Sequence, residues 1–180
     1  NENAELYISD IDEEKVNEVA ENTGATVVDP EDIYGLDVDI FSPCALGGII
    51  NDDTISQFKC DIIAGAANNV LDEENRHGQM LVDHGILYAP DYVINAGGLI
   101  NVFCELEGYH RDRAYKQASR IYDTIYDILT YAENNETLTF QASNVLAEKR
   151  IDSVQRIHQI YAPNSNFSGR LGEMYMKDRY

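Results

Sequence analysis

The chain has 180 residues, of which 44% are hydrophobic and 25% are charged, as in an ordinary globular domain. Its formal net charge of −19 repels phosphate backbones and anionic lipid, so neither nucleic acid nor a membrane surface is an expected partner. No apolar run approaches the roughly 20 residues that cross a bilayer, and the first residues show no signal-peptide pattern, so a cytoplasmic location is expected.

The first two-thirds of the chain alternate strand-like and helix-like segments. A strand predicted at 6–9 is followed by a helical spacing of apolar residues that ends at Gly24. Four more strands are predicted, at 26–28, 38–41, 61–65 and 86–89. The connectors at 53–58 and 71–84 have helical character. This alternation is typical of βαβ units that build a mainly parallel sheet.

The stretch Tyr88–Asn101 carries the most specific local signal. Its short apolar run at 92–94 predicts a last strand, which ends in Asn95 and the pair Gly97–Gly98, and a helical pattern begins directly afterwards. In open α/β sheets, ligands bind at the carboxyl ends of strands, where glycine turns let the backbone approach a cofactor. Asn95 would place a neutral amide, both donor and acceptor, at this edge.

From Gly98 onward the pattern is helical. Two apolar stripes at helical spacing run through 114–129 and 145–158. The predicted fold class is α/β, a Rossmann-like, doubly wound, mainly parallel sheet followed by long C-terminal helices. The expected organisation has three parts: 1–97 as a partial nucleotide-binding domain, 98–162 as a helical region packing on it, and 163–180 as an irregular or disordered tail.

The position of Asp10 leaves two interpretations open. In a dinucleotide-binding fold, the fingerprint G-x-G-x-x-G comes first, and an acidic residue at the end of the second strand then binds the ribose hydroxyls. Asp10 ends the first predicted strand, and no G-x-G-x-x-G occurs in the sequence. Asp10 is therefore either a cap for the helix that follows Ile11, or a ribose ligand in a chain that begins after the first strand of its fold.

The cysteines and histidines predict no metal site. Cys44, Cys60 and Cys104 are widely spaced without a CxxC pair, which indicates three reduced thiols. Cys44 is expected to be a small buried residue, because the sequence shows no neighbouring base that would activate it. His77 and His84 lie seven residues apart with no third ligand in view, so packing or capping roles are expected for them.

Short blocks spread over most of the chain resemble a known family. They run in one order from Leu6 to about Arg156 and include Ser9-Asp-Ile, Val28-Asp-Pro, Asp32-Ile-Tyr-Gly, Asp39-Ile-Phe-Ser-Pro-Cys-Ala-Leu-Gly47, Ile50-Asn-Asp52, Ile63-Ala-Gly, Arg76-His-Gly and Tyr88 through Val102. Together they are similar to the glutamate, leucine, phenylalanine and valine dehydrogenases, and most similar to the leucine dehydrogenases of that family. This many ordered blocks form a specific match.

The resemblance implies an activity for the whole protein. Such enzymes use NAD to deaminate an L-amino acid oxidatively to its 2-oxo acid and ammonia, and a branched-chain substrate (leucine, valine or isoleucine) and a homo-oligomer are expected here. The N-terminal substrate domain, which carries two lysines and an aspartate for proton chemistry, has no match in this sequence, so the chain is expected to be an inactive cofactor-binding half. Phenylalanine or glutamate dehydrogenase, or a non-catalytic nucleotide-binding or assembly module, are the alternatives.

The same resemblance assigns residues position by position, and it places no catalytic residue in this chain. Asp10 would bind the adenosine ribose and repel a 2′-phosphate, which favours NAD over NADP. The full set expected at the cofactor is Asp10, Cys44, Ala45, Ala64, Gly65, Ala66 and Asn95. The residues expected at the substrate are Asn69, which helps to hold its carboxylate, and Leu99 and Val102, which line the pocket for its side chain.

The substrate residues also have simpler interpretations. Leu99 and Val102 are i and i+3 on one helix face, and their aliphatic side chains suit a branched-chain substrate better than glutamate, whose carboxylate needs a polar partner. Without the resemblance, helix–sheet core would explain them equally well. Asn69 could serve only as a turn residue, and Asn68 stands where the family more often has an acidic side chain.

Overall fold

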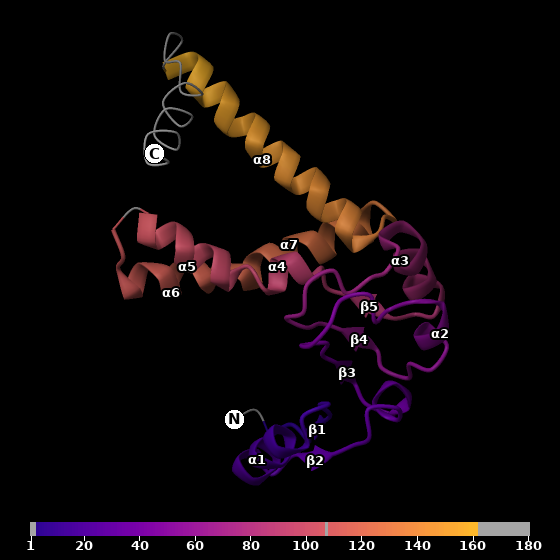
Figure 1. Cartoon of the computed structure of the whole chain (residues 1–180). Helices are drawn as coiled ribbons and strands as arrows, with labels where there is room; N and C mark the ends of the chain where they lie inside the picture. Colours follow the sequence, from indigo (N-terminus) through magenta and orange to yellow (C-terminus); the bar gives the residue numbers. More distant parts are fainter. Residues whose placement is uncertain (1–2, 107, 162–180) are drawn as a thin grey trace, which may run out of the picture. The chain divides into compact units, whose positions relative to one another are not determined.

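A computed structural model describes residues 3–106 and 108–161 as a mixed α/β protein (Figure 1). In chain order its elements are β1 (Tyr7–Ile8), α1 (Glu13–Thr23), β2 (Thr26–Val27), a 3-10 turn η1 (Ile33–Gly35), β3 (Ile40–Phe41), α2 (Asp52–Ile55), β4 (Ile62–Ile63), α3 (Glu74–Asp83), β5 (Leu87–Tyr88), α4 (Asp91–Ile94), α5 (Gly97–Leu106), α6 (Arg111–Ala118), α7 (Arg120–Asn134) and α8 (Thr139–Tyr161). The chain divides into two compact units, 1–142 and a second unit that begins at Ser143. The expected boundary between 97 and 98 stays a prediction, and the predicted tail, 163–180, lies outside the described residues.

All strand pairs are parallel, as the alternation of strands and helices predicts. One sheet pairs β1 with β2, and the other has the order β3-β4-β5. The helix α1 connects β1 to β2; Asp12 caps its start by accepting from the Lys15 N–H, and Gly24 ends it in a left-handed conformation with φ 76°. Left-handed backbone is the conformation that glycine adopts most readily at a helix end.

The core of the first unit surrounds the central strand β4. Ile63 on this strand is fully buried, and the buried apolar residues packed into the same cluster include Ile50, Ile55, Val70 and Leu81. They come from the loop before α2, from α2, from the loop after β4 and from α3. A central strand of a parallel sheet is covered on both faces, so its residues form a continuous apolar run in the sequence. Ile62 and Ile63 of β4 fit this pattern.

From Gly97 onward, the described residues form the helices α5, α6, α7 and α8, joined by short connections. The helix α5 packs along α6, α6 packs against α7, and α4 packs against α7. Ala114, Ile128 and Ala132 are buried among these helices. None of the described helices has the length and apolar composition needed to cross a membrane.

The predicted strand at 92–94 is wrong, because these residues form the short helix α4. Pro90 precedes the helix, and the Asp91 carbonyl oxygen accepts from the Asn95 N–H at 2.9 Å. A three-residue apolar run fits a strand or a helix equally well. The signal that separates them is proline followed by an acidic residue, which favours a helix start.

Gly97 and Gly98 are likewise not a turn, but the first residues of α5. Neither has a positive φ, and an added Cβ at either position would meet no atom within 4 Å. The expected glycine turn is therefore absent at this point of the chain. These two residues do not need to be glycine for the backbone conformation that they adopt.

Candidate cofactor and substrate site

Two loops and the short helix α4 follow the carboxyl ends of β3, β4 and β5. We call residues 42–48, 64–70 and 91–95 the loop cluster. The strands are parallel, so their carboxyl ends lie at one edge of the sheet, which is the edge where open α/β sheets bind ligands. Six of the expected site residues fall in this cluster: Cys44, Ala45, Ala64, Gly65, Ala66 and Asn95; Asn69 of the expected substrate site falls there as well.

Gly65 is fixed by the close approach of two of these loops. A Cβ added at Gly65 would lie 2.1 Å from the Pro43 carbonyl oxygen, far inside contact distance. The same oxygen accepts a hydrogen bond from the Ala67 N–H at 2.9 Å. Glycine at this position is therefore required by loop–loop packing alone. Its expected role beside a cofactor stays a prediction.

Asn95, at the end of α4, is bonded to the loop that follows β4. Its Nδ2 donates to the Asn68 Oδ1 at 2.6 Å and lies 3.5 Å from the Ala66 carbonyl oxygen. Asn68 thus acts as an acceptor, which explains how an amide can replace the acidic side chain more common there in the resembling family. The Asn95 side chain is half-buried, so its Nδ2 is held by Asn68 while part of the side chain is accessible to solvent.

Asn69 has an unusual backbone conformation for a residue other than glycine. Its φ is 52°, and its carbonyl oxygen accepts from the Gly48 N–H at 2.8 Å. Asparagine tolerates this left-handed region better than most residues. The side chain is exposed at the surface of the loop cluster. The turn interpretation and the substrate interpretation are therefore compatible at this position.

Cys44 is exposed, so the expectation that it is buried is wrong. Its Sγ lies 3.6 Å from the Ser42 Oγ, and Ala45 beside it is exposed as well. Only Pro43, the residue that packs on Gly65, is buried in this part of the loop. After the buried Pro43, residues 44–45 are therefore exposed to solvent beyond the carboxyl end of β3.

Asp10 lies on the other sheet, at the carboxyl end of β1. Its side chain is exposed, and its Oδ1 accepts from the Asp12 N–H at 2.9 Å. The cap of α1 is Asp12, whose carboxylate accepts from the Lys15 N–H at 3.1 Å and pairs with the Lys15 Nζ at 2.7 Å. Asp12 therefore takes the capping role, and the ribose-binding role expected of Asp10 stays a prediction.

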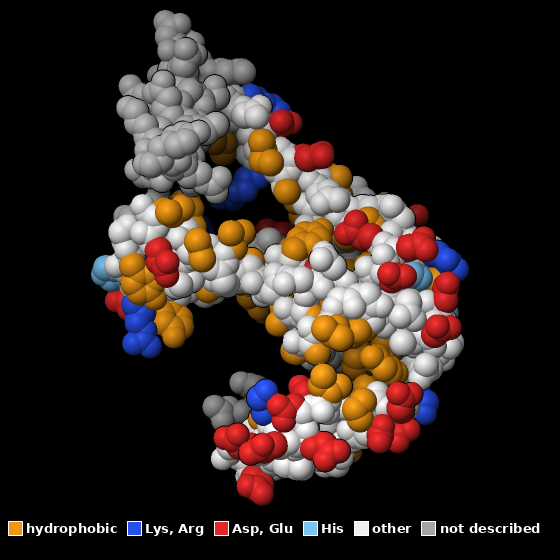
Figure 2. Space-filling model, in the orientation of Figure 1, with side chains coloured by type: hydrophobic (Ala, Val, Ile, Leu, Met, Phe, Trp, Pro, Cys, Tyr) orange, Lys and Arg blue, Asp and Glu red, His pale blue; other side chains and the backbone are white. Residues whose placement is uncertain are grey.

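The surroundings of Asp10 are strongly acidic. Residues 3–39 contain twelve Asp or Glu side chains and one basic side chain, Lys15. Figure 2 shows acidic side chains spread over the segment of β1, α1 and β2. This field opposes an additional phosphate group near Asp10.

Leu99 and Val102 lie on α5 and are 74% and 54% exposed. Phe103 and Leu106 continue the same stripe and are 47% and 70% exposed, so residues 99, 102, 103 and 106 form one apolar helix face. The interpretation of Leu99 and Val102 as helix–sheet core is wrong, because core residues would be buried. An open apolar face at this place is compatible with a substrate side-chain site.

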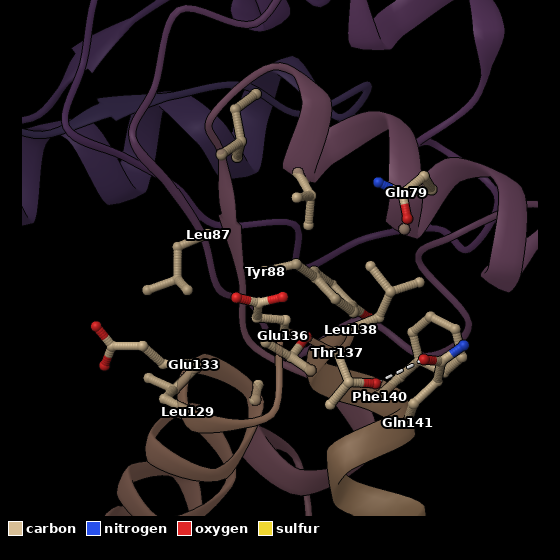
Figure 3. A pocket seen from close by; sticks show the side chains of 15 residues that line it. Gln79, Leu87, Tyr88, Leu129, Glu133, Glu136, Thr137, Leu138, Phe140 and Gln141 are labelled. Atoms are coloured by element: carbon tan, nitrogen blue, oxygen red, sulfur yellow. Dashed lines mark hydrogen bonds between the residues drawn. The ribbon is translucent and has the colours of Figure 1, made fainter.

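A cleft of about 710 Å³ lies between α3, β5 and the α7–α8 connection. Figure 3 shows Leu87, Tyr88, Leu129 and Phe140 around it, with the Thr137 Oγ1 donating to the Gln141 Oε1 at 2.7 Å. None of the expected site residues lines this cleft. The loop cluster is the better candidate because it holds the side-chain amides of Asn68, Asn69 and Asn95 at the carboxyl ends of the strands. The walls of the cleft are mainly apolar.

His77 and His84 each contact main-chain atoms of their own helix region. His77 is buried, its Nδ1 accepts from the Glu73 N–H at 2.8 Å, and its Nε2 lies 3.6 Å from the Asp52 Oδ1. His84 is exposed, and its ring contacts the Met80 carbonyl oxygen at 2.7 Å. Within residues 3–106 and 108–161, no three His, Cys, Asp or Glu side chains gather as metal ligands would.

One residue of the loop cluster is missed by the sequence interpretation. Asp91 is only 5% exposed, and its carboxylate accepts from two main-chain N–H groups, those of Val70 and Tyr92. The available signal is an acidic residue inside the otherwise apolar stretch 86–94. An acidic side chain in such a stretch indicates a buried carboxylate with specific partners.

Comparison with known proteins gives matches along most of the chain. The family model for Glutamate/Leucine/Phenylalanine/Valine dehydrogenase matches residues 4–158. An L-tryptophan dehydrogenase from Nostoc punctiforme is 54% identical over 152 residues, which cover 84% of this chain and 43% of that protein. A leucine dehydrogenase from Geobacillus stearothermophilus is 48% identical over 165 residues, which cover 92% of this chain and 45% of that protein.

The fold comparison agrees with the sequence comparison. The crystal structure of the Nostoc punctiforme L-tryptophan dehydrogenase superposes with a TM-score of 0.83, covering 84% of this chain and 46% of that chain. The chain thus spans less than half the length of the relatives that it matches. Its matches in sequence and in fold converge on one group of enzymes, and the chain belongs to the glutamate/leucine/phenylalanine/valine dehydrogenase family.

Proposed function

We propose that the protein oxidatively deaminates a hydrophobic L-amino acid to its 2-oxo acid and ammonia, with these 180 residues forming the cofactor-binding half. The observation that carries this proposal is the family match over residues 4–158 together with the loop cluster at the carboxyl ends of β3–β5. The proton-transfer groups are proposed to lie on a substrate domain outside these residues. The described loop cluster itself offers amides, glycine and exposed main chain for binding and orientation.

NAD is the proposed cofactor, and the residues present fit it. Asp10 supplies an exposed carboxylate, with one oxygen held by the Asp12 N–H, that can accept from ribose hydroxyls. Asn95, with its Nδ2 anchored on Asn68, can offer its Oδ1 to a carboxamide N–H. The main chain at 44–45 and 64–66 would lie along the cofactor. When bound, NAD+ would supply the hydride acceptor.

The acidic segment supports NAD over NADP. An extra 2′-phosphate would enter the surroundings of Asp10, where residues 3–39 carry twelve acidic side chains and one basic side chain. Like charges disfavour such a group unless an arginine or lysine is placed to receive it. Lys15 is the single basic residue in this segment, and it already pairs with Asp12.

A branched-chain amino acid is the proposed substrate. We propose that the exposed Asn69 side chain helps to hold its carboxylate, and that the exposed aliphatic side chains of Leu99 and Val102 contact its side chain. A glutamate side chain would leave its carboxylate against this apolar surface without a polar partner, at a cost of a few kcal/mol. The 48% identity to a leucine dehydrogenase supports the same choice.

An aromatic substrate is the second candidate, because a tryptophan dehydrogenase is 54% identical to this chain. Phe103 and Leu106 extend the apolar face of α5 beyond Leu99 and Val102, which gives room for a larger side chain. Both candidates are hydrophobic amino acids. They differ in how much of the α5 face the substrate covers.

The substrate assignment is tested with the product of the complete gene and NAD+. Turnover is measured with L-leucine, L-valine, L-phenylalanine, L-tryptophan and L-glutamate under one set of conditions. The highest kcat/KM is expected for leucine or valine. A preference for tryptophan or phenylalanine would establish the second candidate, a preference for glutamate would contradict the apolar-pocket argument, and no turnover with any of them would contradict the proposed function.

The exposed apolar residues Ile151, Val154 and Ile157 on α8 repeat at helical spacing, as a subunit contact would. We propose a homo-oligomer in the cytoplasm, in line with the free cysteines. Light scattering of the purified gene product would give its mass, and a monomeric mass would contradict this proposal.

A further inference from the structure

Asp91 is the only buried acidic side chain among the residues that the structure describes. Its Oδ2 accepts from the Val70 N–H at 2.8 Å, and its Oδ1 accepts from the Tyr92 N–H at 2.6 Å. Tyr92 is the next residue in α4, whereas Val70 lies 21 positions earlier, in the loop after β4. The carboxylate therefore ties the start of α4 to the loop that carries Asn69.

The peptide group between Asn69 and Val70 is held at both of its polar ends. The Gly48 N–H donates to the Asn69 carbonyl oxygen at 2.8 Å, and the Val70 N–H donates to Asp91. Asn69 has φ 52°, a left-handed conformation that is uncommon for residues other than glycine and that asparagine tolerates better than most. Because the peptide group is planar, rotating it would break both hydrogen bonds.

Gly47 and Gly48, which we call the glycine loop, pack closely against the same peptide. A Cβ added at Gly47 would lie 2.6 Å from the Asn68 carbonyl oxygen and 2.8 Å from the Asn69 carbonyl oxygen. Only glycine lets the backbone at 47–48 come this close. The Asn69–Val70 peptide is thus enclosed between a glycine loop and a buried carboxylate, while the Asn69 side chain remains exposed.

We propose that Asp91 is a positioning residue that fixes the direction of the Asn69 side chain for the substrate carboxylate. The inference rests on the proposed function, in which Asn69 contacts the substrate. The two N–H donors bind different oxygens of the Asp91 side chain, and a carboxamide has only one oxygen to offer. Asp91→Asn keeps the size of the side chain but turns an N–H₂ group toward one of the two donors.

The test uses the product of the complete gene, with NAD+ and L-leucine or the panel substrate with the highest kcat/KM. Asp91→Asn is expected to raise the KM for the amino acid about tenfold, while the KM for NAD+ changes less than twofold. A residue needed only for folding would lower the fraction of active enzyme and therefore kcat, and it would leave the amino-acid KM unchanged. An unchanged amino-acid KM in Asp91→Asn overturns the proposal.

A double-mutant cycle separates this proposal from the proposed function. Asn69→Ala alone is expected to raise the amino-acid KM, and adding Asp91→Asn to it should raise the KM less than twofold further. If Asn69→Ala leaves the KM unchanged, the substrate role of Asn69 is wrong and the Asp91 inference falls with it. If Asn69→Ala raises the KM and Asp91→Asn does not, only the Asp91 inference is overturned.

Two further variants complete the experiment. Asp91→Glu keeps two acceptor oxygens on a longer side chain and serves if Asp91→Asn does not fold; its amino-acid KM should rise about threefold, and an unchanged value would overturn the proposal. Asp83→Asn removes an exposed carboxylate that accepts from the Gln79 amide, and it is the matched control. It should leave both KM values unchanged.

Discussion

At the scale of single residues, buried polar groups determine how the loop cluster is built. The Tyr88 hydroxyl accepts from the Asp91 N–H at 3.3 Å, and Asp91 in turn holds Val70. Tyr88 is 7% exposed. Because burial penalises the charged phenolate, the pKa of Tyr88 is raised well above its ordinary value of 10.0.

This raised pKa predicts a loss of stability in alkali. As the pH rises above about 10, the unfolded chain loses the Tyr88 proton before the folded chain does, so stability is full below that pH and falls above it. Tyr88→Phe should lose about 1 kcal/mol less stability than the wild type between pH 8 and pH 11. Urea unfolding at both pH values measures this difference.

Two comparisons make the alkaline test specific. Burial also raises the pKa of the Cys60 thiol, so some alkaline loss remains in Tyr88→Phe. The control is Tyr122→Phe, which removes the same hydroxyl from a side chain that is 76% exposed. Equal alkaline losses in Tyr88→Phe and the wild type would contradict the prediction.

Asp10 gives a second prediction at this scale. Asp10→Asn removes the carboxylate proposed to accept from the ribose hydroxyls, so kcat/KM with NAD+ should fall about tenfold, a loss of about 1.4 kcal/mol. The ratio of the NADP+ to the NAD+ rate should rise, because repulsion of a 2′-phosphate weakens. Steady-state kinetics with both cofactors measures the two effects, and Glu18→Gln on the exposed surface of α1 is the control. An unchanged cofactor ratio would show that Asp10 does not contact the ribose.

At the scale of elements, two kinds of glycine must be distinguished. Gly65 joins β4 to a loop that packs directly on Pro43, whereas Gly98 lies in the first turn of α5 with open space around it. The first is required by a close approach between loops. The second is required by neither its φ nor its neighbours.

These surroundings predict opposite outcomes for two alanine substitutions. Gly65→Ala places a methyl group 2.1 Å from the Pro43 carbonyl oxygen and should lower the free energy of unfolding by about 3 kcal/mol. Gly98→Ala should leave stability unchanged or raise it by up to about 1 kcal/mol, because alanine favours a helix. Urea denaturation of the three proteins provides the measurement. Similar losses in both variants would contradict the assigned packing.

At the scale of the whole molecule, binding of a dinucleotide needs more than the loop cluster. The pyrophosphate of a dinucleotide normally sits on a glycine-rich turn at a helix N-terminus. The sequence contains no G-x-G-x-x-G, and it spans less than half the length of its relatives. The described residues include those proposed for the ribose and the nicotinamide, but they contain no such fingerprint for the phosphates.

The 180 residues alone are therefore expected to bind NAD+ weakly, with a Kd above about 1 mM, equivalent to less than about 4 kcal/mol. Isothermal calorimetry on the purified chain measures this affinity, and the product of the complete gene is the reference. Binding of NAD+ by the isolated chain with micromolar affinity would show that the phosphate contacts are not needed.

Local patterns in the sequence determined much of the architecture. Alternating apolar segments predict the parallel strands, and Gly24 marks the end of α1, because periodicity and left-handed caps depend on near neighbours. Ordered residue blocks along the chain indicate its family for the same reason, as they are properties of the linear sequence. The candidate site residues of the loop cluster could be proposed from these blocks, whereas the buried Asp91 could not.

Contacts between distant segments were decided only by the tertiary structure. The Asp91–Val70 and Asn95–Asn68 hydrogen bonds join loops that are 21 and 27 residues apart, and a linear pattern does not encode such distances. The short run at 92–94 fits a strand or a helix until its packing is known. The exposure of Cys44 and the tight packing at Gly65 follow from how neighbouring loops meet at the edge of the sheet, so they too belong to the folded chain.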